Sequence, residues 1–390
     1  MKYELIATAT FGLEAVVRME LQELGYQVLK TEDGKVTFVG DEKAVVHSNM
    51  WLRTADRVYI KVAEFSAETF EDLFQQVRGL PWENFLPIDA AFPVVGTSVK
   101  STLHSVPSCQ SIIKKAIVSR LSDFYVQKHF EENGASYRVR FSILKNKVTI
   151  MLDTSGAGLH KRGYRVFDVA APMKETLAAA LVKLSFWKEG VMRRDKDNPE
   201  HFSRMLVDTC CGSGTILIEA AMMARNIAPG LTRKFAAMDW DLIPDELWDE
   251  ERQAAYRAVD YDSELIIRGF DINGKAIASA QANAAEAGVE EDITFNRMDM
   301  RKFRAAVSNG VIITNPPYGE RIGDREAIHG IYFRLKEILE NDPSCSLFMI
   351  TTDREVEEIF DRKADRRRKL YNGRLQTTYY QFHGQKMANK

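Results

Sequence analysis

The sequence predicts an α/β protein in two parts: a small α+β layer followed by a doubly wound sheet. From Val166 onward, short apolar runs alternate with helical patterns, as in a doubly wound sheet. One of these runs leads directly into a glycine-rich turn and then into a helix. The first 65 residues instead alternate short strands and helices, as in a small α+β layer. At 390 residues, the chain is expected to hold two or three domains.

The N-terminal elements follow from their apolar patterns. Tyr3–Thr8, Val36–Val39 and Val58–Phe65 are expected to be strands. Leu13–Leu24 has the periodicity of an amphipathic helix, and Gly25 is expected to end it.

The next segment is expected to be built around one long helix. Cys109–Phe130 carries apolar residues at helical spacing, and Phe92–Lys100 before it is expected to be a strand. Tyr137–Leu144 and Lys147–Leu152 are expected to form a hairpin, and Gly156–Arg165 to close the domain.

Positive charge is concentrated in this segment. The formal net charge is −2, but residues 100–167 carry twelve Lys and Arg against four Asp and Glu, a balance of +8 that leaves −10 for the rest. Such a local basic segment is typical of a nucleic-acid footprint. A solvated helix face would give the same pattern.

The second part is expected to contain six strands, at residues 205–208, 265–270, 292–296, 310–314, 344–351 and 376–383. Arg366–Lys369, between the last two, has the composition of an exposed basic loop. Asn226–Asp262, which contains Trp240 and Trp248, is expected to be an insertion near the site described next.

The turn Asp208–Thr215 follows an apolar run and precedes a good helix former. Its glycines allow the backbone to approach a ligand closely. Asp271 ends the next strand, where it could bind ribose hydroxyls, and Asp299 after a third strand could contact an adenine amine. A dinucleotide site is the alternative, although the interval from Asp208 to Asp271 exceeds the ~20 residues of a dinucleotide fingerprint.

Asn315-Pro316-Pro317-Tyr318, after the apolar run that ends at Thr314, predicts a rigid polar pocket. The Asn315 amide oxygen and the Pro316 carbonyl could accept the two hydrogens of a nucleobase amine and free its lone pair. Tyr318 could stack on the base, after the base leaves its own stack. Asn-Pro and Pro-Tyr-Gly are also ordinary turn residues.

These motifs appear in the order found in class I S-adenosylmethionine-dependent methyltransferases of the amino-methylating type, which the chain resembles. Leu159–Arg165, Ala171–Ala179 and Ile227–Gly230 resemble the bacterial THUMP-domain RNA guanine-N2 methyltransferases. The resemblance is closest to the guanine-N2 half of the 23S ribosomal RNA large-subunit enzymes. Some of these enzymes carry a second, C-terminal methyltransferase module, which is expected to be absent. Cys210 departs from the family, which often has Pro or Phe there.

The resemblance implies a ferredoxin-like subdomain at 1–65, a THUMP RNA-binding domain at 66–165 and a Rossmann-like seven-stranded methyltransferase domain at 166–390. The last strand would be the antiparallel edge strand of that sheet. The implied donor is S-adenosylmethionine, with no metal and no covalent intermediate. The implied cofactor-binding residues are Asp208, Cys211, Gly212, Ser213, Gly214, Thr215, Asp271, Ile272, Asp299, Met300, Met173 and Thr176, and the implied catalytic residues are Asn315, Pro316, Pro317 and Tyr318.

The implied substrate is RNA, with 23S ribosomal RNA the first choice and transfer RNA the second. An N6-adenine methyltransferase and a non-catalytic RNA-binding protein are the alternatives. Clustered cations could contact RNA phosphates. The candidates are Lys114, Lys115 and Arg120 on the long helix, Lys161, Arg162 and Arg165 between the two parts, and Arg321 after the Asn-Pro-Pro-Tyr motif.

Other classes of protein are disfavoured. The longest apolar runs are too short to span a membrane, and the start shows no secretory pattern. The four cysteines have no metal-ligand spacing, which favours a reduced, cytoplasmic protein. The sequence does not indicate an oligomeric state.

Overall fold

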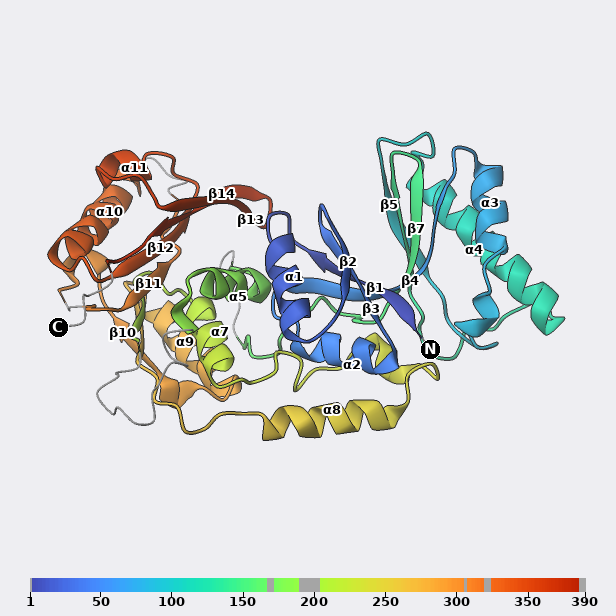
Figure 1. Ribbon diagram of the computed structural model, residues 1–390, viewed down its shortest axis with the longest axis horizontal. Helices are drawn as coiled ribbons and strands as arrows, with labels where there is room; N and C mark the ends of the chain where they lie inside the picture. Colours follow the sequence, from blue (N-terminus) through green and yellow to red (C-terminus); the bar gives the residue numbers. More distant parts are fainter. Residues whose placement is uncertain (1, 167–171, 189–203, 305–306, 319–323, 386–390) are drawn as a thin grey trace. The chain divides into compact units, whose positions relative to one another are not determined.

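The computed structural model describes residues 2–166, 172–188, 204–304, 307–318 and 324–385 (Figure 1). Contacts between residues divide the chain into two compact units. The first consists of residues 1–8, 17–159 and 233–254. The second consists of residues 9–16, 160–232 and 255–390.

The first unit is built on one seven-stranded sheet in the order β2-β3-β1-β4-β7-β6-β5. Its strands are β1 (Tyr3–Ala9), β2 (Val28–Glu32), β3 (Lys35–Gly40), β4 (Ala55–Ser66), β5 (Val94–Val99), β6 (Val139–Leu144) and β7 (Lys147–Asp153). The helices of this part of the chain are α1 (Glu14–Glu23), α2 (Glu42–Trp51), α3 (Phe70–Arg78), α4 (Val106–Tyr125) and α8 (Asp245–Arg257).

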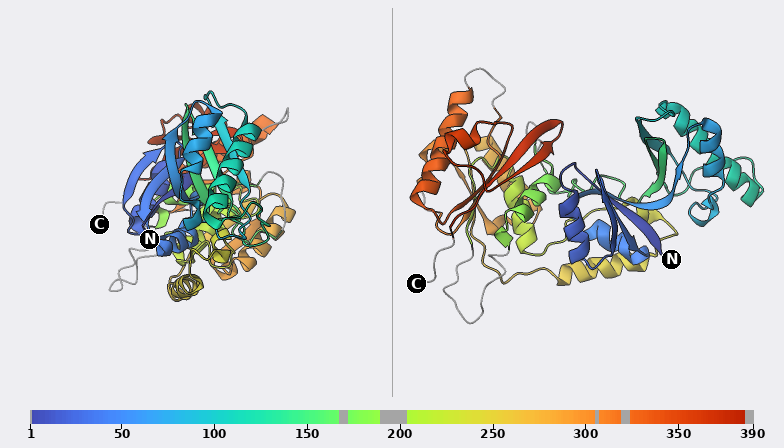
Figure 2. Two further views of the ribbon diagram at one scale, coloured as in Figure 1. Left: turned by 90° about the vertical axis from the view of Figure 1, so that its right-hand side faces the viewer. Right: turned by 45° about the horizontal axis from the view of Figure 1, so that its top comes forward.

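Strand β4 joins the two halves of this sheet. It has β1 on one side, and on the other it pairs with β7 in antiparallel register from Tyr59↔Asp153 to Ser66↔Lys147. Helices α3 and α4 lie together on one face of the β4-β7-β6-β5 half (Figure 2). The expected hairpin turns at Lys145 and Asn146, whose φ angles of 51° and 65° are typical of a tight hairpin turn.

Residues 233–254 of the expected insertion pack within the first unit. That the insertion lies near the predicted cofactor site stays a prediction. The Trp240 ring stacks on Tyr137 with 4.6 Å between centroids, and its Nε1 donates to the Ser136 carbonyl at 3.0 Å. Trp248 stacks on Phe235 at 5.3 Å. Large apolar rings need a buried surface, but the sequence does not reveal which core provides it.

The second unit contains the other seven-stranded sheet, in the order β10-β9-β8-β11-β12-β14-β13. Its strands are β8 (Leu206–Asp208), β9 (Ile267–Asp271), β10 (Ile293–Arg297), β11 (Val311–Thr314), β12 (Ser346–Thr351), β13 (Arg366–Asn372) and β14 (Leu375–Phe382). Strands β8 to β12 of this sheet run parallel, and β14 is antiparallel to β12. The helices are α5 (Glu175–Leu184), α7 (Thr215–Ala224), α9 (Gly274–Glu286), α10 (Asp324–Asn341) and α11 (Val356–Ile359).

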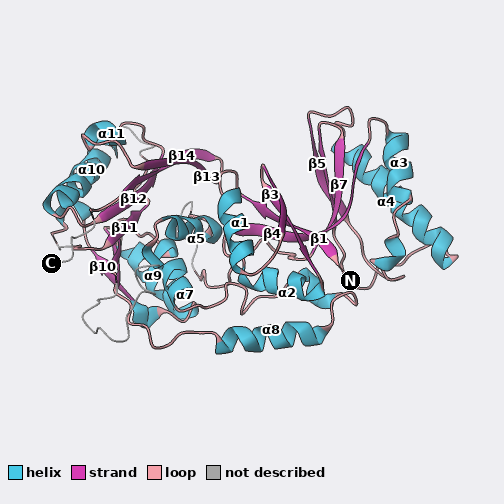
Figure 3. Ribbon diagram, viewed as in Figure 1, coloured by secondary structure: helices cyan, strands magenta, loops and turns pink. Residues whose placement is uncertain are grey.

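Both faces of this sheet are covered, which explains why its central strands β8, β11 and β12 are buried along their whole length. Side chains of β11 alternate between the two faces. Val311 and Ile313 pack with α5, α7 and α9, whereas Ile312 packs with α10 and α11 (Figure 3). This doubly wound arrangement confirms the predicted α/β fold.

The expected edge strand is one place from the edge. Strand β14 lies between β12 and β13, and β13 is the edge strand. Arg366–Lys369, expected to be a loop, therefore pairs with β14, in register from Arg366↔Gln381 to Lys369↔Thr378. Charged side chains are suited to an exposed edge because they oppose pairing with another chain.

Candidate active site

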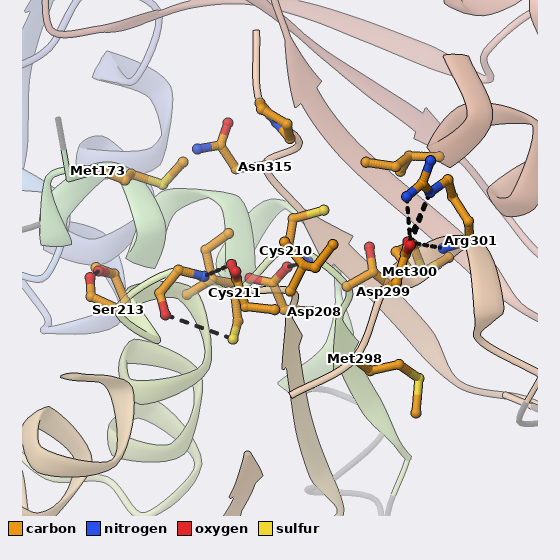
Figure 4. A pocket seen from close by; sticks show the side chains of 18 of the residues that line it. Met173, Asp208, Cys210, Cys211, Ser213, Met298, Asp299, Met300, Arg301 and Asn315 are labelled. Atoms are coloured by element: carbon orange, nitrogen blue, oxygen red, sulfur yellow. Dashed lines mark hydrogen bonds and ion pairs between the residues drawn. The ribbon is translucent and has the colours of Figure 1, made fainter. Parts of the chain in front are cut away.

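A cavity of about 440 Å³ opens beyond the carboxyl ends of β8, β9 and β11. Open α/β sheets bind their ligands at this edge. In Figure 4, Met173 and Ser213 lie on one side and Asp299 and Arg301 on the other, with Asn315 above the middle. The lining residues are Pro172, Met173, Asp208, Thr209, Cys210, Cys211, Gly212, Ser213, Thr215, Ile216, Asp271, Ile272, Met298, Asp299, Met300, Arg301, Asn315, Pro317, Ala327 and Ile331.

The glycine-rich turn gives the cavity an open backbone wall. Gly212 has a φ of 55°, and no atom lies within 4 Å of the place its Cβ would occupy. The backbone is therefore exposed to a ligand at this point. Gly214 has a φ of 81° and begins α7, where a Cβ would meet the Phe295 ring at 3.0 Å. Gly214 does not line the cavity, and its missing side chain instead allows α7 to pack closely on β10.

Hydrogen bonds tie the turn to the strand that carries Asn315. The Asp208 carboxylate accepts from the Thr314 hydroxyl at 2.9 Å and from the Cys210 N–H at 3.1 Å. The Thr209 hydroxyl donates to Thr314 Oγ1 at 3.1 Å. Because Asn315 directly follows Thr314, these bonds fix its position relative to the turn.

Asp208 is almost fully buried, at 1% exposure. Its Oδ2 has no hydrogen-bond partner among the described residues. Burial raises its pKa to about 7, with the Asp271 charge as a further cause. A carboxyl group in this position is therefore partly protonated near neutral pH.

The two carboxylates predicted to bind the nucleoside lie where the sequence suggests. Asp271 accepts from the Gly212 N–H at 3.0 Å and from the Asn273 N–H at 2.8 Å. Asp299 accepts from the backbone N–H of Arg301 at 3.0 Å and from its Nη2 at 2.6 Å. Hydrogen bonding to Arg301 lowers the pKa of Asp299. These backbone hydrogen bonds hold both carboxylates in a fixed direction, as a ligand with hydroxyl or amine donors requires.

The Asn315 side-chain oxygen is buried and has no hydrogen-bond partner among the described residues. A buried acceptor without a donor is costly, so this position is suited to a donor on a ligand. Pro317 also lines the cavity, whereas the buried Pro316 does not. Tyr318 does not line it either, and its hydroxyl accepts from Asn372 Nδ2 at 3.1 Å. The stacking role of Tyr318 stays a prediction.

Met173 and Thr176 differ in their position. Met173 lines the cavity just before α5. Thr176, in the first turn of α5, is 1% exposed and does not line it. A second cavity of about 410 Å³ shares Pro172 and Met173 with the first and is also lined by Lys161. Its remaining lining residues are His160, Arg162, Gly163, Arg165, Lys174 and Glu175.

Two of the cations predicted to bind RNA are engaged inside the second unit. Arg162 is 3% exposed and donates to Glu219 at 3.2 and 3.3 Å. The Arg165 guanidinium donates to Glu175 at 2.9 Å. Lys161 is exposed. Arg321 lies outside the described residues.

The remaining predicted RNA contacts lie on α4 in the first unit. Lys114 pairs with Glu132 at 2.5 Å, and Arg120 Nε donates to Glu83 at 2.9 Å. Lys115 is exposed, with its Nζ 5.9 Å from the centre of the Phe74 ring. Their contacts with RNA stay predictions.

Sequence reasoning missed several lining residues. Thr209 and Cys210 belong to the predicted turn, and their position in it was a sufficient signal. Met298 and Arg301 lie on either side of Asp299 in the sequence, and neither belongs to a motif that the sequence alone would mark as cofactor-binding. Ala327 and Ile331 lie on α10, and only the fold brings that helix to the cavity.

No helix among the described residues has the length and apolar character needed to cross a membrane. Over the same residues, no group of three or more His, Cys, Asp or Glu side chains is arranged to hold a metal ion.

Family models match three consecutive parts of the chain. An RlmL ferredoxin-like domain matches residues 4–59, and a THUMP domain matches residues 67–153. An RMKL-like methyltransferase domain matches residues 162–381, which is more than half of the chain.

Two curated proteins are similar along nearly the whole chain. "Putative RNA methyltransferase YpsC" of Bacillus subtilis is 46% identical over 98% of this chain and 96% of its own length. "Ribosomal RNA large subunit methyltransferase K/L" of Cellvibrio japonicus is 30% identical over 98% of this chain. The chain spans about half of that protein, 51% of its length.

Two solved structures are similar in both sequence and fold. A "predicted N6-adenine-specific DNA methylase" from Listeria monocytogenes is 45% identical, with a TM-score of 0.89, over 99% of this chain and 97% of its own. SMU.472, described as "a putative methyltransferase complexed with SAH", is 43% identical with a TM-score of 0.90, over 99% of each chain. The chain therefore belongs to the RMKL-like methyltransferase domain family, is a methyltransferase that uses S-adenosylmethionine, and carries this domain behind an RlmL-type ferredoxin-like domain and a THUMP domain.

Proposed function

We propose that this enzyme methylates the exocyclic N2 of a guanine in 23S ribosomal RNA. The observation that carries the proposal is the buried Asn315 side-chain oxygen, which has no hydrogen-bond partner among the described residues and lines the donor cavity. An exocyclic amine provides the hydrogen-bond donors that this acceptor requires.

The residues around the cavity fit the donor. Gly212 leaves the backbone open for a ligand, and Asp271 at the end of β9 offers a carboxylate for ribose hydroxyls. Asp299 and Met300 would bind the adenine at the other side of the cavity from Met173. When bound, S-adenosylmethionine supplies an electrophilic methyl group.

The chain's own contribution to the reaction is orientation and polarisation. Asn315 Oδ1 and the Pro316 carbonyl would accept the two amine hydrogens, which localises the nitrogen lone pair toward the donor. The hydrogen bond that the Thr314 hydroxyl donates to Asp208 holds this strand end in place before the substrate arrives, so little reorganisation is needed. After the methyl group has moved from sulfur to nitrogen, the methylated amine carries one surplus proton, which water can accept.

RNA is supported as the substrate by the THUMP domain and by the RNA methyltransferases among the relatives. The ribosomal RNA in the name of the Cellvibrio relative favours the large-subunit RNA over transfer RNA. Lys115 and Lys161 are exposed cations that would contact its phosphates.

The test compares RNA nucleosides from a deletion strain and its parent by mass spectrometry, with ribosomal and transfer RNA separated. We expect N2-methylguanosine to fall in 23S ribosomal RNA. A loss confined to transfer RNA would move the substrate there, and unchanged N2-methylguanosine in both would refute the proposal.

The purified enzyme tests the mechanism. Asn315→Ala should lower kcat by about 10²–10³, as loss of a preorganised polar group does, while the affinity for S-adenosylhomocysteine is kept. Asn296→Ala, on the exposed side of β10, is the matched control and should retain full activity. Unchanged turnover in Asn315→Ala would contradict the proposed role.

N6-adenine methylation is the second candidate because the Listeria relative is described as a predicted N6-adenine-specific methylase. Both targets are exocyclic amines, and Asn315 would serve either. The same nucleoside analysis separates them, because N6-methyladenosine would then fall and N2-methylguanosine would not.

A further inference from the structure

The guanidinium of Arg165 connects two walls of the donor cavity. Its Nη2 donates to the Met173 carbonyl at 3.1 Å and to Thr215 Oγ1 at 3.3 Å. Its Nη1 donates to Ser213 Oγ at 3.2 Å. Met173, Ser213 and Thr215 all line the cavity, and Met173 belongs to a segment distant in sequence from the other two.

Arg165 also pairs with an acidic residue at the start of α5. Its Nε and Nη2 donate to Glu175 Oε1 at 3.1 and 2.9 Å. The Glu175 side chain is 6% exposed and that of Arg165 is 16% exposed, so water screens this pair only weakly. Burial raises the pKa of Glu175, whereas the Arg165 charge and hydrogen bond lower it.

The neighbouring Arg162 is directed at another carboxylate. Arg162 is committed to Glu219 on α7, which also accepts from the Tyr164 hydroxyl at 3.1 Å. The negative charge of Glu219, like burial, raises the pKa of Glu175. Without Arg165, the buried Glu175 carboxylate would have a second carboxylate nearby and would lose its paired cation.

This end of the cavity is where the proposed function places the amino-acid end of the donor, opposite the Asp299 side (Figure 4). That end of the donor carries a carboxylate. It also carries an ammonium group. Glu175 lines the adjoining cavity, which shares Pro172 and Met173 with the donor cavity, and a Glu175 carboxylate that no fixed cation neutralises would repel the donor's carboxylate. The hydrogen bonds of Arg165 to Met173, Ser213 and Thr215 keep the cation at this place.

We propose that Arg165 is a positioning residue for the methyl donor, which neutralises Glu175 and holds the Met173 and Ser213 walls so that the donor's amino-acid end can bind. Arg165 then acts through its neighbours and does not contact RNA phosphates. This inference rests on the donor side of the proposed function and is independent of which base is methylated.

The test measures binding of two ligands by calorimetry in the absence of RNA. S-adenosylhomocysteine has the amino-acid end, and 5′-methylthioadenosine lacks it. Arg165→Met should weaken S-adenosylhomocysteine at least about tenfold, which is 1.4 kcal/mol, and should change 5′-methylthioadenosine much less. Arg165→Met combined with Glu175→Gln should recover most of the loss, because the uncompensated charge is then gone.

Each other outcome overturns the proposal. Equal weakening of both ligands would mean a general loss of structure. Loss of S-adenosylhomocysteine affinity without recovery in the double variant would mean that neutralising Glu175 is not the role of Arg165. Unchanged affinity for both ligands in Arg165→Met would mean that Arg165 has no role at the donor. If the wild-type enzyme bound no S-adenosylhomocysteine, the donor assignment itself would fail, which is a different result from any of these.

Discussion

Asp208 shows how one buried side chain supports the catalytic strand and makes stability depend on pH. Its Oδ1 accepts two hydrogen bonds, from Thr314 and Cys210, and its Oδ2 has none among the described residues. Burial raises its pKa from 3.8 to about 7. The folded protein therefore holds a proton that the unfolded chain releases above its ordinary pKa. The stability that comes from this proton is present at low pH and is lost as the pH rises toward 7.

Asp208→Asn should remove this dependence while keeping an acceptor for both donors. The unfolding free energy of the variant minus that of wild type should rise by about 3 kcal/mol from pH 5 to pH 8, since one pKa unit is worth about 1.36 kcal/mol. Urea unfolding at the two pH values measures it. Asp299→Asn is the control, because the pKa of Asp299 is lowered and its carboxyl group is ionised at both pH values. The difference in unfolding free energy between this variant and wild type should therefore be the same at pH 5 and pH 8. A constant difference in Asp208→Asn would contradict the assigned cause.

At the scale of elements, the centre of the second sheet was the most predictable part, because β8, β11 and β12 are buried on both faces and read as continuous apolar runs. Strand β13 was not predictable in this way. Its Arg366–Lys369 run resembles a loop, and only pairing with β14 makes it a strand. The site followed the same rule. Asp208, Asp271 and Asn315 end strands and were predictable, whereas α10 reaches the cavity only through tertiary packing.

The 233–254 segment gives a prediction at the same scale. Trp240→Ala removes a ring that is 2% exposed and stacked on Tyr137, so it should cost about 3–5 kcal/mol in the first unit. Urea unfolding and a titration with S-adenosylhomocysteine measure stability and donor affinity separately. Donor affinity should remain at the wild-type value, because the segment packs within the first unit.

Tyr261→Ala is the control for Trp240→Ala. This ring is 77% exposed, and its loss should change stability by less than about 0.5 kcal/mol. A fall in donor affinity in Trp240→Ala would mean that the insertion does act on the donor site, as its sequence position first suggested.

For the whole molecule, the uneven charge matters more than the net charge of −2. Several cations of the basic segment pair with carboxylates outside it, as Arg120 does with Glu83 and Arg162 with Glu219. We therefore expect the RNA footprint to be smaller than the balance of +8 indicates and to depend on exposed cations such as Lys115.

Lys115→Ala should weaken RNA binding and reduce the slope of log affinity against log salt by about one, the value for one lost phosphate contact. Filter binding over a series of salt concentrations measures both quantities. Lys336→Ala is the control, because that amine pairs with Asp361 at 2.5 Å in the second unit. An unchanged salt slope in Lys115→Ala would remove this residue from the RNA contacts.

The central position of β4 has a consequence for modularity. The ferredoxin-like model ends at residue 59 and the THUMP model begins at residue 67, so a cut between them passes through or beside β4, which spans Ala55–Ser66. A polypeptide beginning at residue 67 would leave β7 with an unpaired edge, which invites aggregation. The ferredoxin-like and THUMP segments look separable in sequence, but they share β4 in one sheet. Recombination that exchanges one of the two segments would therefore have to keep β4 with the strands it pairs with.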